Sequence, residues 1–101
     1  MYTVFSTFDV PPEKAEEVIG IYQNRSRLVD EAEGFVDFLL LQNERRPGEL
    51  TVQLFFDTKE NYLKWARSED FRRIHELEKK YPDQELAAII PKVAKCQVVA
   101  K

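Results

Sequence analysis

His75 is the only histidine in this chain of 101 residues, and it lies in the segment SEDFRRIHELEKK, four residues after Phe71. The spacing of Phe71, Ile74 and His75 predicts an amphipathic helix that carries the imidazole beside its apolar stripe. A neutral imidazole can ligate a metal or act as a base near neutral pH. A lone histidine on a helix is nevertheless most often a partly exposed residue that bonds water or backbone, so its type alone selects no role.

Few other residues of the chain are typical of catalytic or metal sites. The single cysteine, Cys96, has no second thiol for a disulfide or a zinc site and no histidine beside it in the sequence. The chain contains no P-loop, GxGxxG, HExxH, CxxC or GxSxG motif. Its carboxylates fall mostly on the outer faces of predicted helices, where charge-rich stretches are usually solvated. These observations argue against a conventional hydrolase.

Length and composition indicate a small globular protein. A chain of 101 residues fits one domain, and 44% hydrophobic with 33% charged residues is an ordinary globular mixture. The net charge of −3 argues against general nucleic-acid binding, which requires a positive surface. No apolar run approaches the roughly 20 residues that span a membrane, and MYTVFSTFDV lacks the features of a signal peptide. With one cysteine, the expected compartment is a reducing one, most simply the cytoplasm.

Hydrophobic periodicity divides the first half of the chain into strands and a helix. YTVFSTFDV is rich in β-branched and aromatic residues and predicts a strand, which ends at Pro11-Pro12. FVDFLLLQ and LTVQLFFD predict two further strands, which Pro47-Gly48 joins as an antiparallel hairpin. Between residue 13 and Gly34 the spacing becomes that of one helix, whose apolar stripe is Ala15, Val18, Ile19, Tyr22, Val29 and Ala32.

The second half of the chain repeats the alternation. Asp57 or Thr58 is the expected N-cap of a helix that carries Tyr62 and Trp65, and Ser68 is the expected N-cap of a second helical segment. A loop, YPDQELAAIIP, and a final strand, KVAKCQVVA, follow. The order β-α-β-β-α-β predicts an α+β, ferredoxin-like fold with a four-stranded antiparallel sheet and helices on one of its faces.

Two of the predicted strands carry apolar residues on both faces. Helices cover one face of the sheet in this fold, so the other face is expected to meet another chain. We therefore expect a homodimer that packs sheet to sheet and buries at least roughly 1,200 Å². In FVDFLLLQ the two expected faces are Phe35, Leu39 and Leu41 against Val36, Phe38 and Leu40.

Three segments carry a family resemblance: EGFVDFLLLQ, FFDTKENYLKWARSEDFRRIHE and IIPKVAKCQVVA. Over almost the whole chain they resemble the antibiotic biosynthesis monooxygenase (ABM) superfamily, and most closely its haem-degrading monooxygenases of the IsdG type. The most specific part is the pattern W-x-x-S-x-x-F-x-x-x-H, formed by Trp65, Ser68, Phe71 and His75. Members of the wider superfamily share its tryptophan-to-phenylalanine part without always degrading haem.

The resemblance implies that residues 1–101 form one ABM-like domain, which pairs as a dimeric α/β barrel with one haem in each subunit. At the position of His75 the family has a histidine that binds the haem iron, and at Trp65 a tryptophan that distorts the porphyrin. Where the family has an asparagine that interacts with the iron-bound oxygen species, this chain has Ser6. A serine hydroxyl is shorter and offers one donor rather than two, so this departure affects oxygen activation more than haem binding.

The residues themselves are compatible with these roles and with plainer ones. Ser6 falls on the apolar face of the first strand, so its hydroxyl is expected to point toward the helices, although a hydroxyl bonded within the strand is the more common case. Trp65 precedes His75 by about three turns of a continuous helix and would face the same cavity, although a tryptophan alone is typically a core residue. Phe71 would contact the porphyrin rim.

Arg25 and Arg27, late in the first predicted helix, are the candidates to meet the haem propionates, because guanidinium pairs well with carboxylate. Solvated arginines are the more common finding at such positions.

These observations lead to three functional hypotheses. In the first, a homodimer binds haem through His75, and O₂ with an external electron donor cleaves the porphyrin and releases iron. In the second, the chain is a cofactor-free ABM monooxygenase that oxidises a phenolic or quinol-like molecule, with His75 as a base. In the third, a non-enzymatic dimer holds haem or another small apolar ligand.

Overall fold

The computed structural model describes residues 1–79 and 89–101, with the backbone alone for residues 77–79, so most of the loop predicted at residues 81–91 lies outside the described residues. A four-stranded antiparallel sheet has the order β2-β3-β1-β4. Its strands are β1 (Tyr2–Asp9), β2 (Phe35–Gln42), β3 (Glu49–Phe56) and β4 (Lys92–Gln97). Among the described residues the helices are α1 (Ala15–Gln23), α2 (Lys59–Ala66) and α3 (Glu69–Lys79), with short 3-10 turns η1 (Pro12–Lys14) and η2 (Leu28–Glu31).

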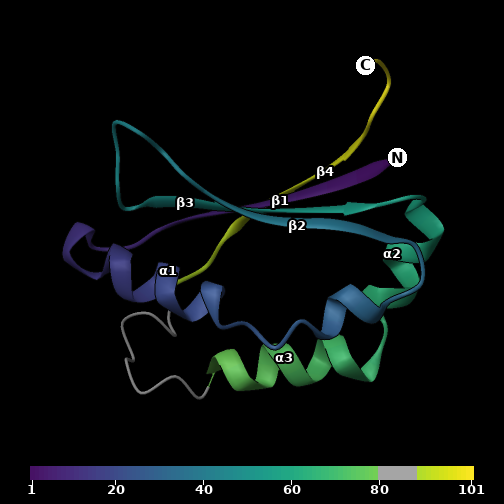
Figure 1. The fold of residues 1–101 in the computed structure, drawn as a ribbon, viewed down its shortest axis with the longest axis horizontal. Helices are drawn as coiled ribbons and strands as arrows, with labels where there is room; N and C mark the ends of the chain where they lie inside the picture. The colour runs from purple at the N-terminus through teal and green to yellow at the C-terminus, as the bar shows by residue number, and fades with distance from the viewer. Residues whose placement is uncertain (80–88) are drawn as a thin grey trace.

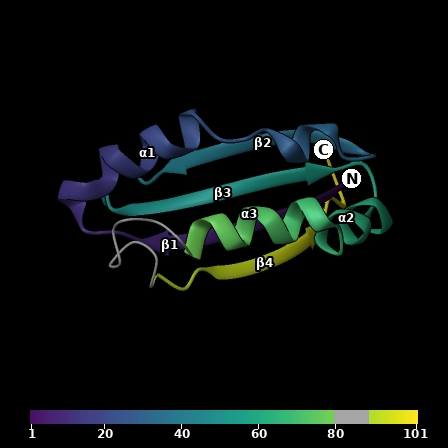
Figure 2. The same cartoon turned by 90° about the horizontal axis from the view of Figure 1, so that it is seen from below.

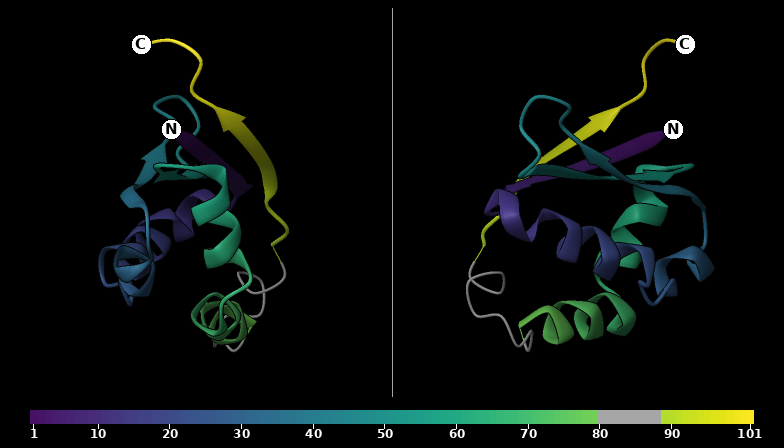
Figure 3. Two further views of the ribbon diagram at one scale, coloured as in Figure 1. Left: turned by 90° about the vertical axis from the view of Figure 1, so that its right-hand side faces the viewer. Right: turned by 60° about the vertical axis from the view of Figure 1, so that its left-hand side comes forward.

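All three helices lie on one side of the sheet (Figure 1). Seen from that side, α1 and α3 run along the sheet and α2 closes one end (Figure 2). The segment after β4 projects away from the helices (Figure 3). The predicted ferredoxin-like fold is therefore confirmed. None of the helices within the described ranges is long and apolar enough to cross a membrane.

Strand pairing explains where the core lies. β1 pairs with both β3 and β4, and β2 occupies an edge beside β3. On the helix-facing side, Leu50 and Phe56 of β3 have no exposed surface. Two buried clusters flank this central strand, one around Phe56, Tyr62 and Trp65 and the other around Leu50 and Val18. Alternate residues of a strand point to opposite faces of the sheet, and the helices cover the face to which the buried apolar residues of β3 point.

The first helix is shorter than predicted. It ends at Gln23, and the Asn24 side chain donates to the carbonyl of Gly20 at 2.9 Å. Residues 23–27 are all polar and offer nothing to bury, and Arg27 takes a left-handed conformation with φ of 60°. Val29 still reaches the core, but from η2 rather than from a continuous helix. The predicted single helix to Gly34 was therefore wrong, because a polar stretch interrupts its apolar stripe.

A bulge in β2 also changes which side chains face the helices. The pairing with β3 shifts between Phe35 and Asp37, so Phe35 packs edge-on against Phe56 at a ring separation of 6.2 Å. The prediction placed Phe35 on one face with Leu39 and Leu41. In the structure Phe35 instead shares the covered face with Phe38. A bulge inserts one residue and reverses the alternation beyond it.

The sheet face turned away from the helices, the outer face, is mixed in character. Leu39 and Leu41 are exposed there, and two pairs of polar side chains bond across β1 and β3 on the same face. Whether a second chain covers this face stays a prediction. By strand register the outer face comprises Thr3, Phe5, Thr7, Asp37, Leu39, Leu41, Thr51, Gln53, Phe55, Lys92, Ala94 and Cys96.

Both predicted helix starts in the second half are confirmed. The Thr58 hydroxyl accepts from the Asn61 backbone N–H at 3.2 Å and caps α2. The Ser68 hydroxyl accepts from the Phe71 backbone N–H at 3.1 Å and donates to the Trp65 carbonyl at 2.7 Å. Ser68 thereby fixes the corner between α2 and α3. The chain turns at this corner, so Trp65 and His75 lie on two separate helices and not on the one continuous helix for which their spacing was considered.

Gly34 occupies a position that only glycine fits without strain. Its φ is +80°, its carbonyl accepts from the Asp57 backbone N–H at 2.8 Å, and a Cβ there would collide with the side chains of Asp57 and Asn61. We expect Gly34→Ala to lower the free energy of unfolding by about 1–3 kcal/mol, because it adds both strain and a clash. Urea denaturation measures this change.

Gly20 provides the matched control. It lies in α1, and a Cβ there would meet no atom within 4 Å. Gly20→Ala is expected to raise the free energy of unfolding by about 0.5–1 kcal/mol, because alanine restricts the unfolded chain. If both variants had wild-type stability, the assignment of strain to Gly34 would be wrong.

Candidate functional site

A cavity of about 420 Å³ lies between the helix-facing side of the sheet and the helices. We call it the helix-side cavity. All six residues singled out from the sequence line it: Ser6, Arg25, Arg27, Trp65, Phe71 and His75. The remaining lining residues are Val4, Ile21, Tyr22, Asn24, Ser26, Leu28, Val29, Phe38, Val52, Leu54, Tyr62, Ile74 and Val93.

Three aromatic rings form one wall of the helix-side cavity. Trp65, at the end of α2, is buried and meets Phe71 edge-on, with ring centroids 5.9 Å apart and an interplanar angle of 88°. Phe71 in turn contacts the His75 ring, with centroids 4.2 Å apart and an angle of 67°. The corner at Ser68 brings these rings together across two helices. Because His75 is exposed overall, its imidazole lies toward the cavity mouth and not in a fully enclosed apolar pocket.

Ser6 lies on the floor of the same cavity. In the sheet it is paired with Val52 of β3 on one side and with Val93 of β4 on the other. Its hydroxyl, which faces the helices as predicted, makes no hydrogen bond to any described residue. The local bonding that would explain a strand serine is therefore absent within the described part of the chain. A polar atom on this apolar floor is available to a bound molecule.

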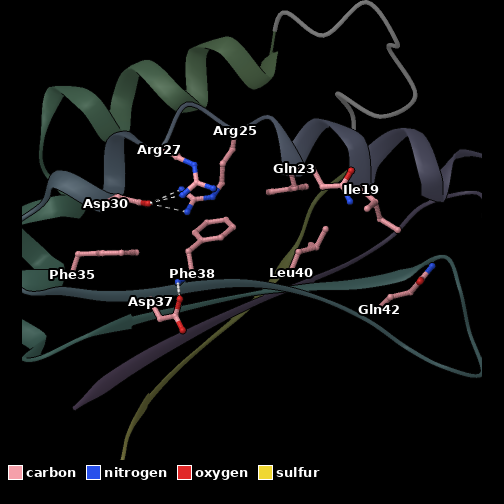
Figure 4. A pocket seen from close by; sticks show the side chains of 11 residues that line it. Ile19, Gln23, Arg25, Arg27, Asp30, Phe35, Asp37, Phe38, Leu40 and Gln42 are labelled. Atoms are coloured by element: carbon pink, nitrogen blue, oxygen red, sulfur yellow. Dashed lines mark hydrogen bonds and ion pairs between the residues drawn. The ribbon is translucent and has the colours of Figure 1, made fainter.

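Arg25 and Arg27 follow the end of α1 and do not belong to the helix in which they were predicted. Both Arg25 terminal nitrogens donate to the Asp30 carboxylate, at 2.8 and 3.2 Å, and the guanidinium lies 4.0 Å above the Phe38 ring (Figure 4). Arg27 reaches the same carboxylate at 3.4 Å and is 70% exposed. The Arg25 charge is thus already paired, so a propionate would have to compete with Asp30.

The Arg25–Phe38 pair also borders a second hollow beside the edge strand β2. This groove has a volume of about 590 Å³ (Figure 4). Four residues line both spaces and form the partition between the groove and the helix-side cavity: Tyr22, Arg25, Arg27 and Phe38. Further residues of the groove are Ile19, Gln23, Asp30, Phe35, Asp37, Leu40 and Gln42.

Tyr62 also lines the helix-side cavity, although the sequence had only placed it on the predicted helix with Trp65. It is one helical turn before Trp65 and only 7% exposed, and its ring packs 5.4 Å from that of Tyr2. Burial, and secondarily the neighbouring Tyr2, raise the pKa of Tyr62 above its usual value of 10.0. The phenol therefore remains a hydrogen-bond donor at neutral pH. The i, i+3 spacing to Trp65 was the signal that could have placed it at the site.

Comparison with known proteins agrees with this arrangement of elements. Residues 1–77 match the sequence model of the antibiotic biosynthesis monooxygenase family. The chain belongs to this family. No curated protein matches this ABM chain.

Solved structures give the same fold at low sequence identity. The haem degrader MhuD from Mycobacterium tuberculosis, solved with two haems in its active site, is 17% identical, with a TM-score of 0.78, and the match covers 100% of this chain and 98% of MhuD. Chains assigned to antibiotic biosynthesis monooxygenases come from Bacillus cereus, at 21% identity and TM-score 0.76, and Deinococcus radiodurans, at 11% and 0.75. These matches cover 99% and 100% of this chain and 92% and 95% of the others. Family membership supports monooxygenase chemistry in general.

Proposed function

We propose that this ABM protein is a haem-binding monooxygenase that cleaves the porphyrin with O₂ and an external electron donor. The observation that carries the proposal is the wall formed by Trp65, Phe71 and His75, which faces Ser6 across one cavity. MhuD, a haem degrader of the same fold, supports it as an analogy.

The residues of the helix-side cavity fit a haem in three respects. The described residues contain no group of three or more His, Cys, Asp or Glu side chains placed to hold a bare metal ion. A metal held by His75 would therefore need most of its ligands from a source other than the protein. Iron in a porphyrin meets this need, because the porphyrin ring itself ligates it. The lining is largely apolar, with flat aromatic rings, and about 420 Å³ falls within the range of small-molecule sites. The position of His75 at the mouth admits a ligand from solvent.

Haem would supply the iron that binds and activates O₂. His75 would hold the iron through its imidazole, and the edge-on contact with Phe71 would restrict the rotation of that imidazole ring. Trp65 would press against the bound ring system, since the Ser68 hydrogen bonds hold the corner that positions it. The Ser6 hydroxyl would donate one hydrogen bond to the bound molecule from the sheet side of the cavity.

Titration of the purified protein with ferric haem tests the proposal. We expect a saturable shift of the Soret band and, after addition of reductant in air, loss of that band with release of iron to a chelator. The absence of any haem-dependent spectral change would overturn the proposal. Saturable binding without turnover under several reductants would instead support a non-enzymatic haem-binding protein.

The pairing of Arg25 with Asp30 favours a second candidate function. Because this charge is already compensated, the helix-side cavity also suits a neutral phenolic or quinol-like substrate that a cofactor-free monooxygenase would oxidise, with His75 as a base. Uptake of O₂ with such substrates, unaffected by added haem, would distinguish this function from the first.

The outer face is our proposed homodimer interface. It carries the exposed Leu39 and Leu41 beside the half-buried Phe5 and Phe55, and a stable dimer would bury at least roughly 1,200 Å² there. Sedimentation at micromolar concentration should give twice the mass of the chain. A monomer under these conditions would contradict this assignment.

A further inference from the structure

Tyr62 has the features of a hydrogen-bond donor held ready for a ligand. The residue is more than nine-tenths buried and lines the helix-side cavity, yet its hydroxyl makes no hydrogen bond to any described residue. Within the described residues, no fully buried side-chain nitrogen or oxygen lacks a partner. The Tyr62 hydroxyl must therefore touch accessible space, and the cavity is the space that Tyr62 borders. Buried polar groups normally have partners, so this one calls for an acceptor from outside the chain.

A cation lies over the ring that carries this hydroxyl. Lys95 is on the helix-facing side of β4, opposite Val4 in the sheet, and its Nζ is 5.7 Å from the centre of the Tyr62 ring. Within the described part of the chain, Lys95 has no ion pair. Tyr62 lines the cavity, and Lys95 lies behind it against the Tyr62 ring, so a neutral donor and a positive charge without an ion pair border the α2 end of the cavity.

The arginines at the other end are less suited to bind an anion. Asp30 accepts from Arg25 at 2.8 Å and contacts Arg27 at 3.4 Å, so one carboxylate already occupies that position. A second carboxylate would meet the negative charge of Asp30. Neither Tyr62 nor Lys95 forms a hydrogen bond or ion pair with a described acidic side chain. A carboxylate has two oxygens and can accept from two separate donors at once.

We propose that Tyr62 and Lys95 form a carboxylate subsite at the border of the helix-side cavity, so that its ligand is an apolar ring system bearing an acidic group. The proposal rests on the proposed function only in taking this cavity as the ligand site, and it does not depend on iron ligation by His75. The acidic group can be a propionate of a porphyrin or the carboxylate of a smaller aromatic acid.

Metal-free protoporphyrin IX tests the subsite, because it binds without an iron–histidine bond. Its fluorescence on titration gives the affinity of the diacid, and the dimethyl ester gives the affinity without the acidic groups. We expect the wild-type protein to prefer the diacid. Tyr62→Phe and Lys95→Met should each reduce this preference about five- to tenfold and leave ester binding unchanged. Naphthalene-2-carboxylate and its amide form a parallel pair for small aromatic acids.

Controls separate this subsite from general effects. Lys92→Met removes a lysine from the same strand, but from the outer face, where it pairs with Thr7, and it should change nothing. His75→Ala should keep the preference for the diacid even if it abolishes haem ligation. A preference in the porphyrin pair alone indicates a haem-like ligand, and one in the naphthalene pair alone indicates a small aromatic acid; both support the subsite. The subsite would be overturned if the wild-type protein bound acids and neutral analogues equally or bound none of the probes. It would also be overturned if Tyr62→Phe and Lys95→Met lowered the affinity for the acid and for its neutral analogue equally.

Discussion

Replacing His75 with alanine should lower the affinity for ferric haem by about 100-fold or more and remove the spectrum of an imidazole-ligated iron. His75 is the only histidine of the chain, so no second imidazole can replace it. Its ring contacts Phe71 but is exposed overall, so the free energy of unfolding should change by only about 0.5 kcal/mol. A large loss of binding with little loss of stability is the pattern of a ligand. Equilibrium titration at the Soret band, together with urea denaturation, measures both quantities.

Two controls make the His75 result specific. Added imidazole should restore an imidazole-type spectrum to His75→Ala, because the cavity and its aromatic wall remain. Cys96 is a free, exposed thiol on the outer face and is a chemically reasonable haem ligand, so Cys96→Ser should leave the spectrum unchanged. Wild-type affinity in His75→Ala, or a changed spectrum in Cys96→Ser, would show that the iron binds elsewhere.

The strands were predictable because each has a local signature. Period-two alternation and the turn residues Pro47-Gly48 placed β2 and β3 within one residue of their observed bounds. The end of α1 was harder to predict, since Val29 continues the apolar stripe beyond a polar interruption and lies in η2 instead. The bulge at Phe35 left no sequence signal, because apolar residues occupy both faces of β2. In both cases the outcome depends on contacts between elements, which a local pattern does not contain.

The site was predictable where its residues share a local motif. Trp65, Ser68, Phe71 and His75 lie within eleven residues, and the Ser68 cap brings the three rings to one wall. The pairing of Arg25 with Asp30 was missed, because in the expected helix these residues would project in different directions. Its formation requires the irregular segment after Gln23.

Ser6→Asn should increase the rate of haem cleavage about tenfold without changing haem affinity. The Ser6 hydroxyl provides one donor on the cavity floor, between Val52 and Val93. An asparagine, which the family resemblance implies at this position, is longer and provides two N–H donors. Donors directed at developing negative charge are worth about 10²–10³ in rate in well-ordered sites, and a partial gain is expected where the backbone was not built for the longer side chain. The Soret decay under reductant, with catalase present, measures this rate.

Ser6→Ala is the matched comparison, because it removes the donor and adds no bulk to the cavity floor. We expect its rate of haem cleavage to fall below that of the wild type, while its spectrum before reductant is added stays unchanged, since His75 and not Ser6 is the proposed ligand. An ordered series of rates, with asparagine above serine and serine above alanine, would tie oxygen chemistry to a hydrogen bond from β1. Equal rates in all three proteins would show that the sheet side of the cavity does not face the reacting oxygen, and the roles assigned to the two sides of the cavity would have to be exchanged.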